Sequence, residues 1–141
     1  MKILYGLLLI LVAGGCPQED IALASVSYEA VSRGFYYKSQ LVEDEILVQR
    51  GRKTDKEKYS CKASHWKQLK KLVTEIDPEL ITELEAPSTK SHYDGAAIAS
   101  ITVEVNGKTY QSNSFDHGNP PEVLKPLVDY VLKLSETVDS P

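Results

Sequence analysis

The sequence lacks the short motifs that most often mark catalytic or nucleotide-binding sites. Its 141 residues contain no Gly-x-Ser-x-Gly nucleophile motif, no glycine-rich phosphate loop, no His-Glu-x-x-His zinc motif and no Cys-x-x-Cys pair. Each of these motifs places specific atoms where a reaction or a ligand needs them. Hydrolase, nucleotide-binding and structural-zinc functions therefore have no specific support in this sequence.

Cysteine is also scarce, because Cys16 and Cys61 are its only two occurrences. Two cysteines exclude a framework of several disulfides. If Cys16 carries a lipid, Cys61 is left as a single thiol, which we expect to be buried or unreactive. If Cys16 carries none, a bridge between the two cysteines stays open in an oxidising compartment.

An excess of positive charge is absent as well. The chain has 16 Lys and Arg against 20 Asp and Glu, which gives a net charge of −4. Removal of residues 1–15 takes away Lys2 and changes this charge to −5. Such mild acidity gives no general affinity for nucleic acid, and we expect no nucleic-acid partner.

The first sixteen residues, MKILYGLLLILVAGGC, are typical of an export signal. The apolar run Ile3–Val12 is too short to cross a bilayer as a helix, which takes about twenty residues, but it suits a signal peptide. The ending Ala13-Gly14-Gly15-Cys16 resembles the lipobox of bacterial lipoproteins. This resemblance implies that Cys16 receives the lipid, becomes the mature N-terminus and anchors the protein to a membrane.

An ordinary secretory signal is the alternative, because Ala13 and Gly15 also fit the small-x-small pattern for cleavage at the same bond. Pro17, and not Asp, follows the cysteine. By resemblance to lipoprotein sorting signals, this favours the outer membrane of the cell envelope. The predicted organisation is a signal peptide over 1–15, a lipidated N-terminus and tether over 16–25, a single domain over 26–135 and a tail over 136–141.

Residues 97–115 contain the clearest structural signal, a β-hairpin. Asn106-Gly107 stands between two runs of alternating apolar and polar residues, and both residues tolerate the positive φ of a type I′ turn. Closing the turn there pairs Val105 with Lys108 and Val103 with Tyr110. One face of the hairpin is then apolar and the other polar.

Residues 26–50 alternate in the same way and predict a second hairpin. We interpret Ser32–Gly34 as a bulge in its first strand and Glu43-Asp44 as its turn. The polar residues 51–62 are interpreted as a loop or a frayed strand end.

Helical periodicity follows each hairpin. Apolar spacing predicts a helix that starts near Ser64 and ends at Ile76, with a short segment after Asp77-Pro78. In the last helix, Pro126 either introduces a kink or marks a fresh start. The elements predict an α+β two-layer sandwich with a four-stranded, mainly antiparallel sheet, two helices on one face, and the order ββαββα.

Two imidazoles and two carboxylates flank the hairpin of residues 97–115. Since the ends of hairpin strands meet at one edge of a sheet, we consider these residues for a divalent metal site or a general acid–base pair. The Asp-Gly and His-Gly steps in this cluster are also typical of ordinary turns, and a turn carboxylate can hydrogen-bond backbone amides. The candidates are His92, Asp94, Asp116 and His117.

Residues 50–71 are strongly basic, with nine Lys and Arg against Asp55 and Glu57, a local charge of +7. Such asymmetry suits a surface for anionic lipid, glycan or an acidic protein, although an ordinary solvated face has the same composition. The candidate residues are Arg50, Arg52, Lys53, Lys56, Lys58 and Lys62, followed by Lys67, Lys70 and Lys71.

The aromatic run Phe35-Tyr36-Tyr37 is the third candidate site. Neighbouring strand residues point to opposite faces, so if helices cover one face, part of this run lies on the other. Tyrosine is favoured at binding surfaces, although exposed tyrosines are also common on strands. We therefore predict an interaction surface at Tyr36, Tyr37 and Lys38.

The runs SRGFYY, YDGAA and SFDHGNPPE resemble small uncharacterised lipoproteins of Bacteroidota. The resemblance implies no known activity and transfers no catalytic residue. We expect an envelope lipoprotein whose domain is a non-catalytic binding module, with an envelope protein, anionic lipid or glycan as partner and no cofactor. The alternative is a metal-binding protein or acid–base enzyme that uses the His/Asp cluster.

Overall fold

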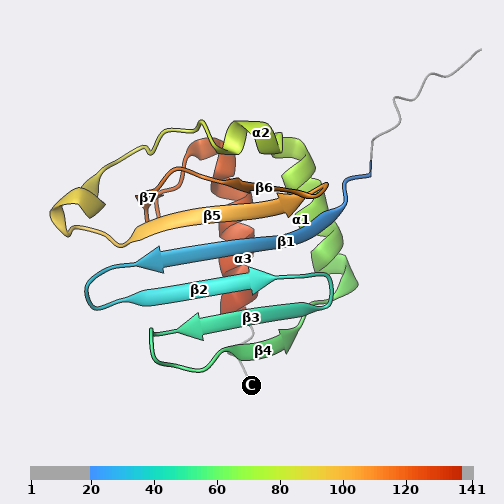
Figure 1. The fold of residues 1–141 in the computed structure, drawn as a ribbon, viewed down its shortest axis with the longest axis horizontal. Helices are drawn as coiled ribbons and strands as arrows, with labels where there is room; N and C mark the ends of the chain where they lie inside the picture. Colours follow the sequence, from blue (N-terminus) through green and yellow to red (C-terminus); the bar gives the residue numbers. More distant parts are fainter. Residues whose placement is uncertain (1–19, 138–141) are drawn as a thin grey trace, which may run out of the picture.

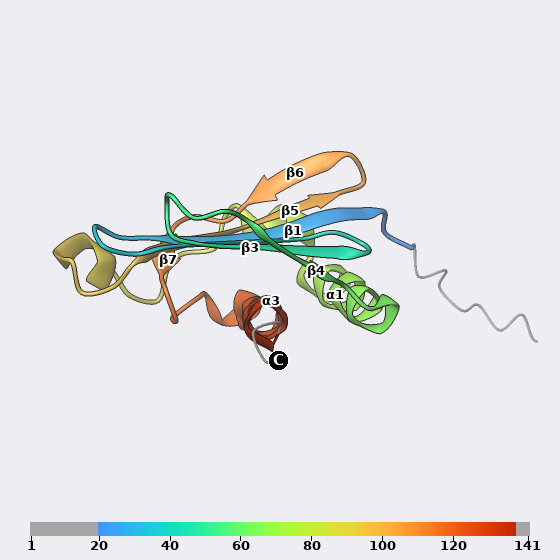
Figure 2. The ribbon, with the colours of Figure 1, turned by 90° about the horizontal axis from the view of Figure 1, so that it is seen from below.

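A seven-stranded antiparallel sheet carries helices on one of its faces (Figures 1 and 2). The computed structural model describes residues 20–137. The strands are β1 (Leu23–Val31), β2 (Tyr36–Leu41), β3 (Glu45–Arg50), β4 (Glu57–Ser60), β5 (Ile98–Val105), β6 (Lys108–Gln111) and β7 (Phe115–Asp116). The helices are α1 (Ala63–Ile76), α2 (Pro78–Ile81) and α3 (Lys125–Thr137), with the 3-10 helices η1 (Lys90–Tyr93) and η2 (Glu122–Leu124).

The predicted antiparallel α+β class is confirmed, whereas the strand number and the order of elements are wrong. The sheet has seven strands and not four, arranged β4-β3-β2-β1-β5-β6, with β7 paired to β5 beyond the end of β6. Along the chain, four strands are followed by two helices, three strands and one helix, in place of ββαββα.

The first error lies at Ser32–Phe35, which is a turn between two strands and not a bulge within one. The Ser32 amide donates to the Phe35 carbonyl oxygen over 2.9 Å, and Val31 is paired with Tyr36. Because the alternation continues unchanged on either side, the pattern does not distinguish the two structures. As a result β1 is a central strand that pairs with both β2 and β5.

The second difference lies in residues 51–62, interpreted as a loop or a frayed strand end, where Glu57–Ser60 forms the edge strand β4 and pairs with β3. Three of the four side chains of β4 are exposed and only Tyr59 is half-buried. An edge strand with little burial needs no alternation of apolar and polar residues. The sequence pattern therefore has the appearance of a loop.

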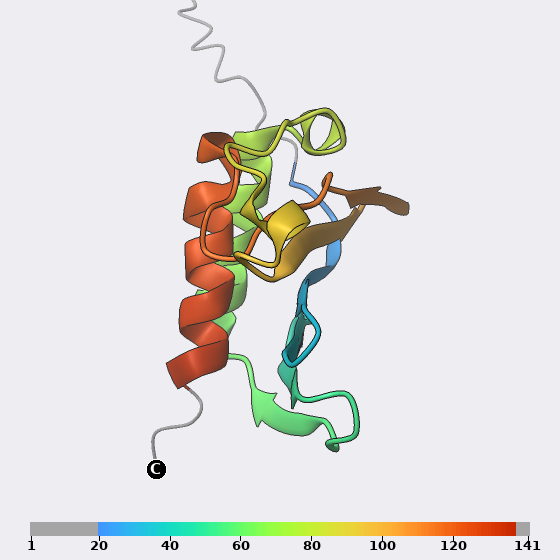
Figure 3. The same ribbon diagram turned by 90° about the vertical axis from the view of Figure 1, so that its left-hand side faces the viewer.

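The central hairpin forms as predicted. Asn106 and Gly107 have φ values of 53° and 75°, as a type I′ turn requires. Val105 is paired with Lys108 and Val103 with Tyr110. This hairpin twists, so that β6 rises toward the side of the sheet that faces away from α1 and α3 (Figures 2 and 3).

Both long helices cover the same face of the sheet (Figure 2). Residue Lys62, and not Ser64, is the N-cap of α1, whose apolar stripe from Trp66 to Ile76 is buried as predicted. The last helix follows η2 and starts at Lys125. Pro126 therefore lies in its first turn, where a missing amide costs no helical hydrogen bond.

The core lies between this helical layer and the sheet. Val26, Tyr28 and Ala30 point inward from β1 and are each 0% exposed. Phe115 packs against Tyr28 with ring centroids 6.2 Å apart. The intervening side chains of β1 point to the opposite face, which we call the open face because no element of residues 20–137 covers it.

Candidate functional site

The open face has an aromatic and basic corner, at the end where β1 meets β2. The guanidinium carbon of Arg52 lies 5.7 Å from the ring centroid of Tyr36. The same guanidinium donates to the Ser32 carbonyl oxygen over 2.9 Å. The contact between cation and ring, together with this hydrogen bond, fixes a positive charge above the β1–β2 turn. We call Tyr36, Lys38, Arg52 and Lys56 the basic corner.

A shared carboxylate connects the basic corner to the middle of the sheet. Glu29 accepts a hydrogen bond from the Tyr36 hydroxyl over 3.4 Å and forms an ion pair with Lys38 at 3.6 Å. Lys38 and Lys56 also line a narrow depression together with Gln40, Leu47 and Gln49. Two regions that the sequence presents separately, the tyrosine run and the basic stretch, therefore meet on one surface.

A second depression lies next to the corner, near the centre of the open face. It encloses about 190 Å³, and four strands, β1, β2, β5 and β6, contribute to its lining. Short side chains on the central strands β1 and β5 make its floor, because longer ones would fill it. We call it the central hollow, and its lining residues are Ser27, Glu29, Lys38, Ser100, Thr102 and Gln111.

Tyr37 does not belong to this surface. Its side chain points to the helical side, is 9% exposed and packs edge-on against Tyr28 at a centroid distance of 6.4 Å. Burial raises the pKa of its phenol. Of the three residues predicted as an interaction surface, Tyr36 and Lys38 lie on the open face and Tyr37 is part of the core.

Asp116 of the predicted metal cluster is buried and holds η1 in place. Its carboxylate accepts hydrogen bonds from the amides of Lys90 and Ser91, each over 2.8 Å, and from the Ser88 hydroxyl. The Ser88 hydroxyl and these amides hold the pKa of the carboxyl well below its usual range. A carboxylate in this state is a weak base, and its oxygens already have protein partners.

The other three members of that cluster lie in three different environments. His117 is hydrogen bonded through Nδ1 to the hydroxyl of Tyr28 at 2.8 Å, whereas His92 is exposed and Asp94 ends η1 in the left-handed conformation. Within residues 20–137, no group of three or more His, Cys, Asp or Glu side chains is placed to hold a metal ion. The structure therefore does not assemble His92, Asp94, Asp116 and His117 into one site.

The predicted basic stretch is divided between several places. Arg50 and Lys58 form ion pairs with Glu57 at 3.0 Å and Glu45 at 2.6 Å. Arg52, Lys53 and Lys56 lie in the loop between β3 and β4, and Lys62 precedes α1. Lys58 lies across from Leu47 on the open face but is engaged by Glu45, whereas Arg52 and Lys56 lie beside the aromatic and polar side chains of that face.

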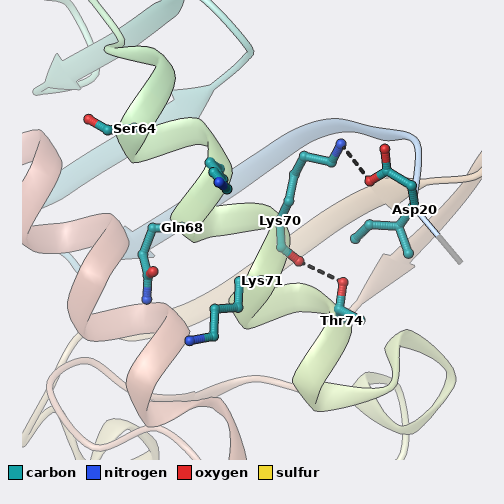
Figure 4. A pocket seen from close by; sticks show the side chains of 8 residues that line it. Asp20, Ser64, Gln68, Lys70, Lys71 and Thr74 are labelled. Carbon is teal, nitrogen blue, oxygen red and sulfur yellow. Dashed lines mark hydrogen bonds and ion pairs between the residues drawn. The ribbon is translucent and has the colours of Figure 1, made fainter. Parts of the chain in front are cut away.

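The lysines of α1 surround a broad, shallow depression of about 630 Å³ on the helical side (Figure 4). Lys70 forms an ion pair with Asp20 at 3.0 Å, while Lys71 points away from Asp20. Acidic Glu43, Asp44 and Glu75 lie close to these lysines along the chain or around an adjoining depression. The local charge is thus mixed, and this depression is a weaker candidate than the open face.

Comparisons with known proteins give no family for this chain. No family model, curated protein or solved structure matches it.

No helix in residues 20–137 is both long and apolar enough to span a bilayer. The predicted signal peptide and the lipidation site Cys16 lie outside the described residues. Cys61 is buried with a free thiol, and burial raises the pKa of this thiol.

Sequence reasoning missed the central hollow as a site. The hairpin pattern puts Ser100 and Thr102 on its polar face, but their neighbours on β1 and β2 depend on the pairing of β1 with β5. That pairing joins residues 67 to 82 positions apart, such as Ser27 and Thr102. The available signal was the occurrence of short polar residues at alternate positions in two separate strands.

Proposed function

We propose that this protein is a lipoprotein of the cell envelope, attached to the outer membrane through Cys16, and that its domain is a non-catalytic binding module. The open face is the binding surface, with the basic corner and the central hollow as its two contact regions. The acidic net charge of −4 makes this basic corner a local feature that favours an anionic group on the partner.

The observation that carries this proposal is the position of Arg52 over Tyr36 beside the hollow. The charge is held in place by a ring and a backbone carbonyl, so little side-chain freedom is lost when a ligand binds. In contrast, Arg50 and Lys58 are engaged with acidic neighbours.

The geometry of the chain supports presentation of this surface away from a membrane. Asp20 is four residues after Cys16, so their Cα atoms are at most about 14 Å apart in any conformation. Asp20 lies beside α1 near the start of β1, and the β1–β2 turn with the basic corner lies at the opposite end of that strand (Figure 1). A lipid on Cys16 would leave the corner at the far end of the domain.

The anchor is tested by fractionation of cells that produce the full-length chain or its Cys16→Ser variant. Wild type is expected in the membrane fraction and the variant in the soluble fraction after mild lysis. Metabolic labelling with a fatty acid should mark wild type only. Equal distribution without labelling would contradict the lipoprotein assignment and leave an ordinary secretory signal.

The binding surface is tested by photo-cross-linking in intact cells. A photoreactive residue is placed on the open face at Gln49 or at Thr109, which pairs with Glu104 outside the hollow. The controls carry it at Lys67 or Lys71, which are exposed on α1. We expect one and the same adduct from both open-face positions, absent from both α1 positions and lost when Tyr36→Ala and Arg52→Ala are combined. The same adducts from both sides of the domain would overturn the proposal.

A further inference from the structure

All six side chains around the central hollow are polar, and their charges cancel. Ser27, Ser100 and Thr102 offer hydroxyl groups that both donate and accept hydrogen bonds. Gln111 adds an amide, and Glu29 and Lys38 form an ion pair of zero net charge. Such a lining matches an uncharged group that carries several hydroxyls of its own, because each lining group then keeps a partner when water leaves.

The hollow continues into a track with a positive end. Lys38 borders both the hollow and the neighbouring narrow depression, whose other lining residues are Gln40, Leu47, Gln49 and Lys56. Arg52 lies over Tyr36 beside this end of the track. The open face therefore offers neutral hydrogen-bonding groups first and cationic groups next to them, within a width of a few strands.

The residues that line this track fit some classes of ligand better than others. The centres of protein–protein interfaces are depleted in Lys, Glu and Ser, which are prominent here. Single-stranded nucleic acids need exposed aromatic faces, whereas the Tyr36 ring is covered by Arg52. Lipid insertion needs a large apolar surface, and the hollow has none among its lining residues.

From these observations we infer that the open face binds an acidic polysaccharide strand. The central hollow takes a hydroxyl-bearing sugar ring, and the basic corner takes the carboxylate, sulfate or phosphate of a neighbouring unit. This inference rests on the proposed function only in using the open face as the binding surface. It requires neither the lipid on Cys16 nor a particular membrane.

The test measures binding of the full-length protein, in a mild non-ionic detergent, to a panel of oligosaccharides. The panel contains uronic-acid, sulfated and phosphorylated oligomers beside neutral ones of equal length. We expect an acidic oligomer to bind at least about tenfold more tightly than its neutral counterpart, with an affinity that falls as salt rises.

Two kinds of variant locate the site. Ser100→Tyr fills the hollow on a strand that tolerates tyrosine, and should weaken binding about tenfold or more. Thr102→Val removes one hydroxyl at nearly constant shape and should weaken binding several-fold, which guards against misfolding of the larger substitution. Lys38→Gln combined with Lys56→Gln should reduce both affinity and its salt dependence.

The matched control is Lys67→Gln combined with Lys71→Gln, which removes the same charge from α1, and it should bind as wild type does. Equal loss in this control would show attraction to net charge alone and overturn the inference. Failure of every acidic oligomer to bind would overturn it too. In that event a surviving adduct at Gln49 and Thr109 in cells would keep the binding module and point to a protein partner.

Discussion

The hydroxyl of Tyr28 lies 2.8 Å from Nδ1 of His117, and this hydrogen bond joins the central strand to the loop after β7. Tyr28 is fully buried, and the His117 ring also lies 5.6 Å from the ring of Phe35 in the β1–β2 turn. Burial lowers the pKa of His117, and the nearby charge of Glu136 offsets this only in part. His117 therefore favours the neutral state in the folded protein.

Acid should destabilise the fold through this residue. Because the unfolded chain binds the His117 proton more tightly, unfolding takes up a proton as pH falls. The stabilisation is complete above the ordinary histidine pKa of 6.5 and is lost as pH falls from there through the lower folded pKa. Denaturant titrations from about pH 7.5 to about pH 5 should show this loss in wild type.

The variant His117→Gln should be less stable than wild type near pH 7.5 but should change less across the same range. His65 and His92 are present in both proteins, so their contributions cancel in the comparison. Parallel curves for wild type and variant would contradict the assignment of this pH dependence to His117.

A second acid effect should come from Asp116. Its lowered pKa stabilises the fold above the ordinary value of 3.8, and this contribution is lost as pH falls below that value. Asp116→Asn should therefore destabilise the protein at neutral pH and show a smaller further loss below about pH 4. Hydrogen exchange at the amides of Lys90 and Ser91 should become faster in this variant.

Asp94→Asn is the matched control for Asp116→Asn. It makes the same change of charge at an exposed residue where the left-handed backbone, with φ of 57°, also suits Asn. Its stability and the exchange rates in η1 should stay close to wild type. If Asp94→Asn had the larger effect, the carboxylate of Asp116 would not be what holds η1.

The sequence supported those parts of the fold that depend on neighbouring residues. Asn106-Gly107 specifies its turn by local backbone preference, and the α1 stripe is visible in fourteen consecutive residues. The turn at Ser32–Phe35 escapes prediction because the alternation of apolar and polar residues continues on both sides of it, as it would on both sides of a bulge. The difference in strand count comes from that turn, from the exposed edge strand β4 and from the two-residue strand β7.

The sites were harder to predict because they depend on distant pairing. The contacts of Asp116 are with amides 25 and 26 positions earlier, so the turn interpretation was available but its partners were not. Similarly, Arg52 and Tyr36 are 16 positions apart, and their contact requires the start of β2 and the end of β3 to lie side by side. The residue types indicate both the basic stretch and the tyrosine run in the sequence. Only the pairing of the strands shows that the two lie together.

The two glycines Gly107 and Gly34 provide a test of turn chemistry. A Cβ at either position meets nothing within 4 Å, but only Gly107 has positive φ, 75°. Gly107→Ala should therefore cost about 1–2 kcal/mol in free energy of unfolding. Gly34→Ala should be neutral or stabilise by up to about 1 kcal/mol, because it restricts the unfolded chain without strain. Equal effects in urea titrations would show that backbone conformation does not distinguish the two turns.

The contact between Arg52 and Tyr36 should be measurable as a coupling free energy. A double-mutant cycle with Arg52→Ala and Tyr36→Ala should give about 0.5–1 kcal/mol, the range for a cation over a ring at an exposed site. Replacing Arg52→Ala by Lys53→Ala, a change of equal charge at an exposed residue of the same loop, should give no coupling to Tyr36→Ala.

This coupling bears on binding because it shows whether the guanidinium of Arg52 is held in place or moves freely. If Arg52 is held by Tyr36, Tyr36→Ala should weaken binding of an anionic ligand even though the arginine remains, by releasing the guanidinium into several rotamers. Tyr36→Phe keeps the ring and loses only the hydroxyl that donates to Glu29 over 3.4 Å, so it should retain most of the affinity. An equal loss in both variants would assign the effect to the Glu29 hydrogen bond, and the stacked arginine would then have no part in preparing the surface.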